Sequence, residues 1–414
     1  MRSLIRRRAA ASDLPREVWV LAAVAFCVAL GFGIVAPVIP VFARRFGVGQ
    51  TAAGLVISAF AFMRLAFGPA AGAIVNRLGE RLVMATGVGI VAVSSLLTGL
   101  AVNYPQMLGL RAVGGVGSVM FTVSAQSLLL GSVPASQRGR ASSMYRGGFL
   151  LGGLTGPALG GVLGGISLRL PFFIYAATLG LAGVIALAQL HRPGTTAATT
   201  VAEATPPATL RATLRNPAYQ AALTVNGAVG WAIFGVRSSL VPLFVVEVLG
   251  RGPLWVGLGL LASSLADVAT LYPAGRLADT TGRRPMLLIG SACGVVATGL
   301  LAVAPNLPAY LLAMVLWGVT SSFLSASPAA VVGDVVGGRS GTVVAVFGMT
   351  SDLGAVAGPL VTGALAQHVS YAAAFTSTSA VLGLGLLMSL RMPETLRRTP
   401  VPKAIESRPA RHAM

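Results

Sequence analysis

Two carboxyl groups of this 414-residue chain lie where a carboxyl group is costly. Asp267 and Asp352 are deep in apolar sequence, about 18–20 Å along a helix from the charged turns that contain Asp279 and Arg339. An ionised side chain at that depth in a membrane costs at least about 2.5–3.5 kcal/mol and is by default a sign of function, such as proton exchange. The same apolar sequence holds four arginines that could balance these acids: Arg64, Arg111, Arg146 and Arg237.

The composition indicates which elements must position these groups. Hydrophobic residues make up 55% of the chain, charged residues 10%, and the mean hydropathy is +0.81. A helix needs about 20 apolar residues to cross a bilayer. The sequence therefore predicts an all-α membrane protein with twelve spanning helices, near 18–42, 52–75, 82–101, 106–130, 141–165, 170–190, 218–245, 253–276, 286–304, 308–332, 341–365 and 371–391.

The basic residues predict the orientation. Of the 30 lysines and arginines, 22 lie on the side of the two termini and four on the opposite side, in the turns between spans. Because cytoplasmic loops carry the excess of basic residues, we expect both termini in the cytoplasm and a multi-pass protein of the cell membrane. The net charge of +19 then reflects orientation, and we expect no nucleic-acid partner. The first apolar run is too long for a signal peptide and is expected to remain as the first span.

The chain contains an internal duplication. Three pairs of stretches match at an offset of 202 or 203 residues: 72–82 with 275–285, 32–42 with 234–244, and 153–161 with 355–363. The Thr/Ala/Pro-rich stretch 191–217 is the one long linker. We therefore expect a cytoplasmic tail (1–17), a six-helix bundle (18–190), this linker, a second six-helix bundle (218–391) and a second tail (392–414).

The repeated turns carry a recognisable signature. The stretch Gly275-Arg-Leu-Ala-Asp279-Thr-Thr-Gly282-Arg283-Arg284 and its first-half copy resemble the loop between spans 2 and 3 of the major facilitator superfamily, and the resemblance covers essentially the whole chain. It implies two pseudo-symmetric bundles and a gate of contacts that form in one state of a rocking transporter. The first-half copy keeps four matching residues and replaces the usual aspartate by asparagine: Gly72, Arg77, Gly79, Arg81 and Asn76. An ordinary positively charged turn is the alternative.

Further motifs are similar to the drug:proton antiporters of that superfamily. The stretches 30–40 and 108–118, the latter with Arg111, resemble its signatures for spans 1 and 4. The fifth expected span carries an antiporter-type motif of small residues and a proline, which suits close helix packing: Gly152, Gly156, Pro157, Gly160 and Gly161. Packing without any transport polarity is the alternative for this motif.

The resemblance also implies which charges meet. In the family, span 2 meets span 11 and span 5 meets span 8 across the two halves, which predicts an Arg64–Asp352 pair and a looser Arg146–Asp267 pair. These pairs could instead only neutralise each other. Four arginines against two aspartates favour an anionic or neutral amphiphile over a cation as substrate. Residues expected to line the cavity, although any of them could simply pack, are Asn226, Trp231, Phe234, Tyr145 and Trp317.

The sequence thus predicts a secondary transporter that exports a small organic compound or drug by proton antiport through alternating access. The alternatives are a metabolite or sugar facilitator or symporter, and a non-transporting receptor on the same fold. The sequence contains no nucleophile–base set, metal cluster or phosphate-binding loop, so we expect no enzyme activity, no metal and no cofactor other than the proton gradient. The expected partners are the substrate, protons and the lipid bilayer, with the protein acting as a monomer.

Overall fold

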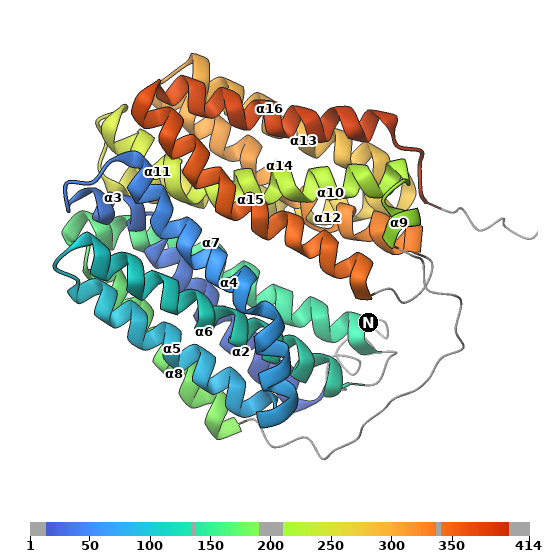
Figure 1. The fold of residues 1–414 in the computed structure, drawn as a ribbon, viewed down its shortest axis with the longest axis horizontal. Coiled ribbons are helices and arrows are strands. Elements are labelled where there is room, and N and C mark those ends of the chain that lie inside the picture. Colours follow the sequence, from blue (N-terminus) through green and yellow to red (C-terminus); the bar gives the residue numbers. More distant parts are fainter. Residues whose placement is uncertain (1–13, 134–136, 190–209, 337–340, 397–414) are drawn as a thin grey trace, which may run out of the picture.

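The computed structural model describes residues 14–133, 137–189, 210–336 and 341–396 (Figure 1). The side chain of Asp279 and most of the predicted linker and tails lie outside this description. The first half contains α2 (Arg16–Val35), α3 (Ile39–Arg44), α4 (Gln50–Leu78), α5 (Glu80–Leu100), α6 (Tyr104–Gly131), α7 (Arg138–Ile166) and α8 (Leu170–Gln189). The second half contains α9 (Leu210–Thr213), α10 (Pro217–Val229), the π-helix η2 (Gly230–Val236), α11 (Arg237–Glu247), α12 (Pro253–Thr280), α13 (Arg283–Val303), α14 (Leu307–Val336), α15 (Gly341–His368) and α16 (Tyr371–Arg391).

Within the described residues, twelve helical segments are long and apolar enough to cross a membrane, which confirms the predicted number of spans. The seventh is composite, because α10, η2 and α11 follow one another without a break. The first is shorter than predicted. It ends at Val35, and a turn with Pro37 separates it from α3, whose second residue is Pro40. A proline lacks the backbone N–H that would continue a helix, which explains the interruption.

The helices form two bundles with separate cores. Figure 1 shows the first half, coloured blue to green, lying beside the second half, coloured yellow to red. Almost all residues of one large buried apolar cluster come from the first half, and those of the other come from the second. This arrangement confirms the predicted fold of two pseudo-symmetric six-helix bundles.

The duplication is visible in single hydrogen bonds. In the first half the Arg81 guanidinium donates to the carbonyl oxygen of Leu187, and in the second half Arg284 donates to that of Leu390. Arg284 and Leu390 lie 203 residues after Arg81 and Leu187, respectively, which is the offset of the duplication. The preceding glycines, Gly79 and Gly282, both have positive φ angles, 83° and 123°, which side chains rarely allow. Both copies of the signature turn therefore place a glycine with positive φ before the next helix.

The bundles meet along two pairs of helices, α4 with α15 and α7 with α12. These are the pairings of spans 2 with 11 and 5 with 8 that the sequence predicts. At the end of the seam away from the start of α2, a Cβ atom built on Gly54 would lie 2.5 Å from the Pro359 carbonyl oxygen. One built on Gly257 would lie 2.7 Å from the Cα atom of Gly161. The two halves are therefore in backbone contact there, and we call this end the outer end.

At the opposite end, the glycines on the same helix faces have no close neighbour among the described residues. Gly72 lies 18 residues after Gly54, and Gly275 lies 18 residues after Gly257, which is five helical turns and returns to the same face. A Cβ atom at Gly72 or Gly275 would meet nothing within 4 Å. The seam is thus closed at the outer end and open at the end where α2 begins and α16 ends, and Figure 1 shows the bundles diverging in that direction.

Candidate functional site

The first predicted charge pair lies on the seam. Arg64 is in the middle of α4 and donates through Nη1 to the hydroxyl groups of Ser118, at 2.5 Å, and Thr122, at 3.5 Å, both on α6. Asp352 of α15 faces Arg64 from the other bundle, close enough for the two charges to attract each other but not within ion-pair distance. Both side chains are partly exposed. The structure therefore brings the predicted pair together across the two halves without locking it.

The second predicted pair is wrong. Asp267 of α12 has its charge partner in Arg237, the first residue of α11, and not in Arg146. Arg237 also donates to the Ser263 hydroxyl, at 3.1 Å, one turn before Asp267 on α12, and the Ser321 hydroxyl of α14 bonds to the Asp267 carboxylate. Arg146 is exposed on α7, nearer the open end. Asp267 thus belongs to a network within the second bundle.

Arg111 is a buried cation without an acidic partner among the described residues. Its side chain on α6 is only 3% exposed, and its guanidinium lies 4.5 Å from the centre of the Phe60 ring. Its Nε atom has no hydrogen-bond partner, and the Tyr175 phenol of α8 is the one titratable group that acts on it electrostatically among the described residues. A cation over an aromatic face is attracted to the ring, which offsets part of the cost of burial.

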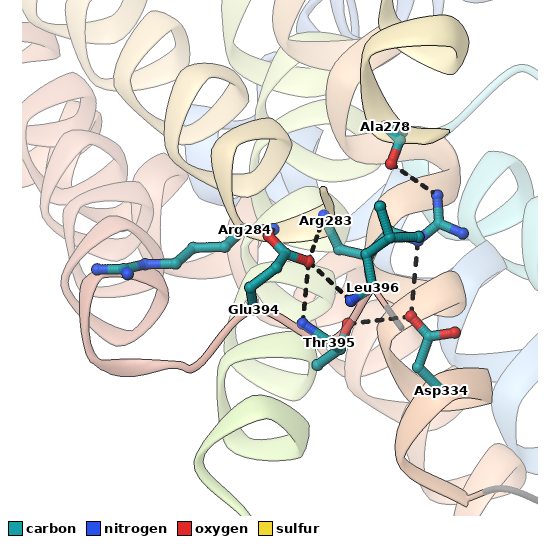
Figure 2. Close-up of polar contacts among 7 residues, drawn as sticks. All are labelled: Ala278, Arg283, Arg284, Asp334, Glu394, Thr395 and Leu396. Atoms are coloured by element: carbon teal, nitrogen blue, oxygen red, sulfur yellow. Dashed lines mark hydrogen bonds and ion pairs between the residues drawn. The ribbon is translucent and has the colours of Figure 1, made fainter. Parts of the chain in front are cut away.

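The second-half signature turn is clamped by the segment that follows the last span. Gly282, the N-cap of α13, has no side chain to accept from the free N–H groups of the first helical turn. The Glu394 carboxylate accepts from the backbone N–H groups of Arg283, at 2.8 Å, and Arg284, at 3.1 Å, as well as from those of Thr395 and Leu396 (Figure 2). A remote side chain therefore caps this helix.

The same clamp includes a second carboxylate. The Nε atom of Arg283 lies 3.6 Å from Asp334 of α14, and its Nη1 atom donates to the Ala278 carbonyl oxygen (Figure 2). The Thr395 hydroxyl donates to Asp334 as well, at 3.0 Å. Sequence reasoning identified Gly282, Arg283 and Arg284 but missed Glu394 and Asp334. The available signal was that each acid lies within three residues of the end of an expected span, 308–332 or 371–391, on the same side as this turn.

Glu394 lies outside the spans, and its pKa is below the usual value of a glutamate. Burial is the largest single influence and raises the pKa, but four backbone N–H donors together lower it by more. These hydrogen bonds favour the charged form of the carboxyl group. The clamp around α13 is therefore a charged clamp at neutral pH.

Among the residues that the structure describes, none clamps the first-half turn in this way. Asn76 and Arg77 are exposed, and Glu80 accepts a hydrogen bond from Ser127, at 3.1 Å. The residue that corresponds to Glu394 at the offset of 203 is His191, which lies outside the described residues. Within the described part of the chain, the carboxylate capping is thus a feature of the second half.

A polar cluster that the sequence did not predict joins the bundles at the outer end. The Glu247 carboxylate, at the end of α11, forms an ion pair with Nε of Arg44 at 2.7 Å. It also accepts from Nε2 of Gln50, at 2.9 Å, and from the Tyr371 hydroxyl, at 2.7 Å. Arg44 and Gln50 belong to the first half, and Glu247 and Tyr371 to the second. We call these four residues the outer latch.

The antiporter-type motif on α7 packs as its small residues predict. A Cβ atom on Gly152, Gly156 or Gly160 would collide with the backbone of α2, which shows how closely the two helices approach. Gly161 instead faces α12 across the seam, where Gly257 and the Pro253 carbonyl oxygen lie within 3.0 Å of such an atom. Pro157 is inside α7, and its carbonyl oxygen faces Gly257. The motif therefore serves both the first bundle and its contact with the second.

The predicted cavity residues fall into three groups. Tyr145 and Trp317 are wrong as cavity residues, because they are 7% and 0% exposed and belong to the apolar cores of the two bundles. Asn226 donates to the Phe347 carbonyl oxygen of α15, and Trp231 donates to Thr378 of α16, so both polar groups are engaged within the second bundle. Phe234, on η2, is 58% exposed.

Twelve spanning segments in two bundles, charges at the seam and an opening at one end define a membrane transporter rather than an enzyme. The sequence model of the Major Facilitator Superfamily matches residues 21–266 and 238–413. The chain belongs to this superfamily. Among the described residues, no group of three or more His, Cys, Asp or Glu side chains could hold a metal ion.

Two curated relatives are bacterial resistance proteins. The chain is 29% identical over 183 residues to the quinolone resistance protein NorA of Staphylococcus aureus, which is 43% of this chain and 46% of that protein. It is 28% identical over 168 residues to multidrug resistance protein 1 of Bacillus subtilis, covering 41% of this chain and 43% of that protein. The matches thus span less than half the length of these relatives.

Solved structures share the fold at low sequence identity. A bacterial homologue of the human lysosomal transporter Spinster, in an inward-facing conformation, covers 90% of this chain and 95% of its own with a TM-score of 0.72 and 15% identity. The human organic anion transporter MFSD10 covers 91% of this chain and 100% of its own with a TM-score of 0.67 and 19% identity. At these identities, the likeness concerns the fold.

Proposed function

We propose that this protein exports a small organic compound, such as a drug, in exchange for protons. The observation that carries the proposal is the Arg64–Asp352 pair, an ionisable pair at mid-depth on the seam between the two bundles. A buried acid at such a position is costly unless it is used, and a proton that binds there can be coupled to the rocking of the bundles. The resistance proteins that match part of this chain support export of an organic compound.

The membrane and its sidedness belong to the same proposal. We infer a location in the cell membrane with both termini in the cytoplasm, because the excess of basic residues lies on that side. The open end of the seam is on the side of the termini, so the present conformation would face the cytoplasm. A compound would then enter from the cytoplasm, and no cofactor other than the proton gradient would be needed.

Reconstitution tests the proposal. Full-length protein in liposomes with an imposed pH gradient is expected to move a fluorescent quinolone such as norfloxacin against its concentration gradient, and to move protons the opposite way. Abolishing the gradient with a protonophore is expected to stop net movement while leaving exchange of labelled for unlabelled quinolone intact. Movement of both in the same direction would indicate a symporter, and exchange that ignores pH would indicate a facilitator. Either result would refute proton antiport.

A further inference from the structure

The two aspartates within the spans differ in where their partners lie. Asp352 is on α15 and Arg64 is on α4, and these helices belong to different bundles. Asp267 is on α12 and Arg237 is on α11, and these helices are neighbours in one bundle. When rigid bundles tilt against each other, the separation of groups on different bundles can change, while the separation within one bundle is kept.

The seam parts at the level of the Arg64–Asp352 pair. On the outer side of the pair, the Ser58 hydroxyl of α4 donates to the Val356 carbonyl oxygen of α15, at 2.7 Å. On the other side, Cβ atoms built on Gly68 of α4 and Gly348 of α15 would meet nothing within 4 Å. Gly348, Asp352 and Val356 follow one another at intervals of four residues and therefore share a face of α15. The pair thus lies where the helix contact ends and the open part of the seam begins.

Few other charges can influence Asp352. Arg64 is the one described residue whose charge reaches it. Among the other helices that contact α15, α10 and η2 contain no charged residue. The remaining contacting helices carry charged residues that do not act on Asp352: Arg211 of α9, Arg237 and Glu247 of α11, Asp334 of α14 and Arg391 of α16. The balance between the protonated and ionised forms of Asp352 therefore depends on Arg64 and on water from the open side.

The Asp267–Arg237 pair has the opposite character. Arg237 donates to Ser263, and the Ser321 hydroxyl bonds to Asp267, so the pair ties α11, α12 and α14 together inside one bundle. The Nε atom of Arg237 has no partner and is buried. Nothing in this network crosses the seam, and tilting of the bundles leaves it intact.

We propose that Asp352 is the acid that exchanges the proton, and that Asp267 with Arg237 is a fixed pair that holds the second bundle together. This inference rests on the proposed proton antiport and names the group that performs it. With Arg64 nearby and the seam open to the side of the termini, the O–H bond of Asp352 breaks and its proton passes to water on that side. With the seam open to the other side, the carboxylate takes a proton from water there.

Two double variants test the inference, because each removes both charges of a pair and leaves no unpaired buried charge. Full-length Arg64→Gln/Asp352→Asn and Arg237→Gln/Asp267→Asn proteins are reconstituted with norfloxacin as the probe. Size-exclusion profiles identical to that of the unmodified protein confirm folding. Each is assayed for pH-driven accumulation and for exchange at equal pH.

The first variant is expected to lose pH-driven accumulation at least tenfold while exchange stays within threefold of the unmodified protein. The second is expected to keep both activities within threefold. The assignment would be overturned if the Arg237→Gln/Asp267→Asn protein lost pH-driven accumulation while keeping exchange. It would also be overturned if the Arg64→Gln/Asp352→Asn protein kept pH-driven accumulation. If the unmodified protein itself shows exchange but no response to pH, the proposed antiport fails first, and the assignment with it.

Discussion

Replacing Glu247 by glutamine is expected to weaken the outer end of the seam and to shift the protein toward a conformation open on that side. The Glu247 carboxylate accepts from Arg44, Gln50 and Tyr371, at 2.7, 2.9 and 2.7 Å. Two of these three donors come from the other bundle, so two contacts must break whenever the outer end opens. The amide of glutamine keeps one acceptor oxygen but loses the charge and one acceptor position.

The size of the effect follows from exposure. The side chains of Arg44 and Glu247 are 33% and 23% exposed, so their ion pair is worth about 0.2–1 kcal/mol, as at a protein surface. The hydrogen bond from Gln50 to a charged acceptor adds on the order of 1 kcal/mol at this exposure. The sum of about 1–2 kcal/mol corresponds to a shift of roughly 5- to 30-fold in the ratio of the two conformations.

Distance measurements between spin labels would report the shift. Labels on Val102→Cys and Val303→Cys, in a background of Cys27→Ala and Cys293→Ala, mark the outer ends of α5 and α13, where Val102 and Val303 are 74% and 80% exposed. The Glu247→Gln protein is expected to populate a longer label distance. Arg251→Gln is the matched control, because this outer arginine lies over the Trp255 ring within the second half.

An unchanged distance distribution in the Glu247→Gln protein would refute the reasoning, since the latch would then contribute nothing to closure. The Arg44→Gln variant provides an independent check, because it removes the same ion pair from the other bundle. Similar shifts in both variants, and none in Arg251→Gln, are expected.

Two further predictions concern the seam and the clamp. Gly257→Ala would place a Cβ atom 2.5 Å from the Pro157 carbonyl oxygen and is expected to lengthen the same label distance, whereas Gly275→Ala, on the same face but with nothing within 4 Å, is expected to leave it unchanged. Glu394→Gln is expected to destabilise the start of α13 by about 0.5–1 kcal/mol, seen as a lower melting temperature in detergent at neutral pH. Because the pKa of Glu394 is lowered, its contribution is present above the usual glutamate pKa and is lost as the pH falls through the lower folded value, so the two proteins should melt alike in acid and differ near neutrality.

The sequence was sufficient for the fold because the relevant signals are long. Twelve apolar segments, a duplication at a constant offset and the signature turns predicted the two bundles and the helix pairs at the seam. It also located the depth of the buried charges, since depth depends only on the count of residues along a helix. Arg64 and Asp352 were paired from the helix contacts that the family resemblance implies, and the structure brings these two residues together.

The direction in which a side chain points around its helix axis could not be predicted in the same way. The partner of Asp267 is Arg237, which directly follows the π-helix η2. A π-helix inserts wider turns, so residues after it point in directions that a regular helix would not give. Arg146 was chosen instead because regular helices and family pairings were assumed.

The sequence also could not predict which face of a predominantly apolar helix lines a cavity. Trp317 and Tyr145 are in predominantly apolar helices with little amphipathic periodicity, so the sequence pattern does not distinguish a cavity from a core. The outer latch was missed for another reason. Its members lie at or near the ends of helices. Glu247 is 197 residues from Gln50 and 124 residues from Tyr371, and only the closed seam brings them together.

Depth alone selects both buried aspartates and cannot decide between them. Asp352 is sixteen residues from the outer end of α15 and eleven from its other end, and Asp267 is fourteen and thirteen residues from the ends of α12. At about 1.5 Å per residue, each is some 17–24 Å from either surface, where a group on the seam can face one side in each conformation. The two aspartates differ in whether their arginine partner lies on the same bundle or on the opposite one. An acid whose countercharge moves with it keeps the same surroundings throughout the cycle, whereas Asp352, with its countercharge on the opposite bundle, can respond to the tilt that carries the substrate.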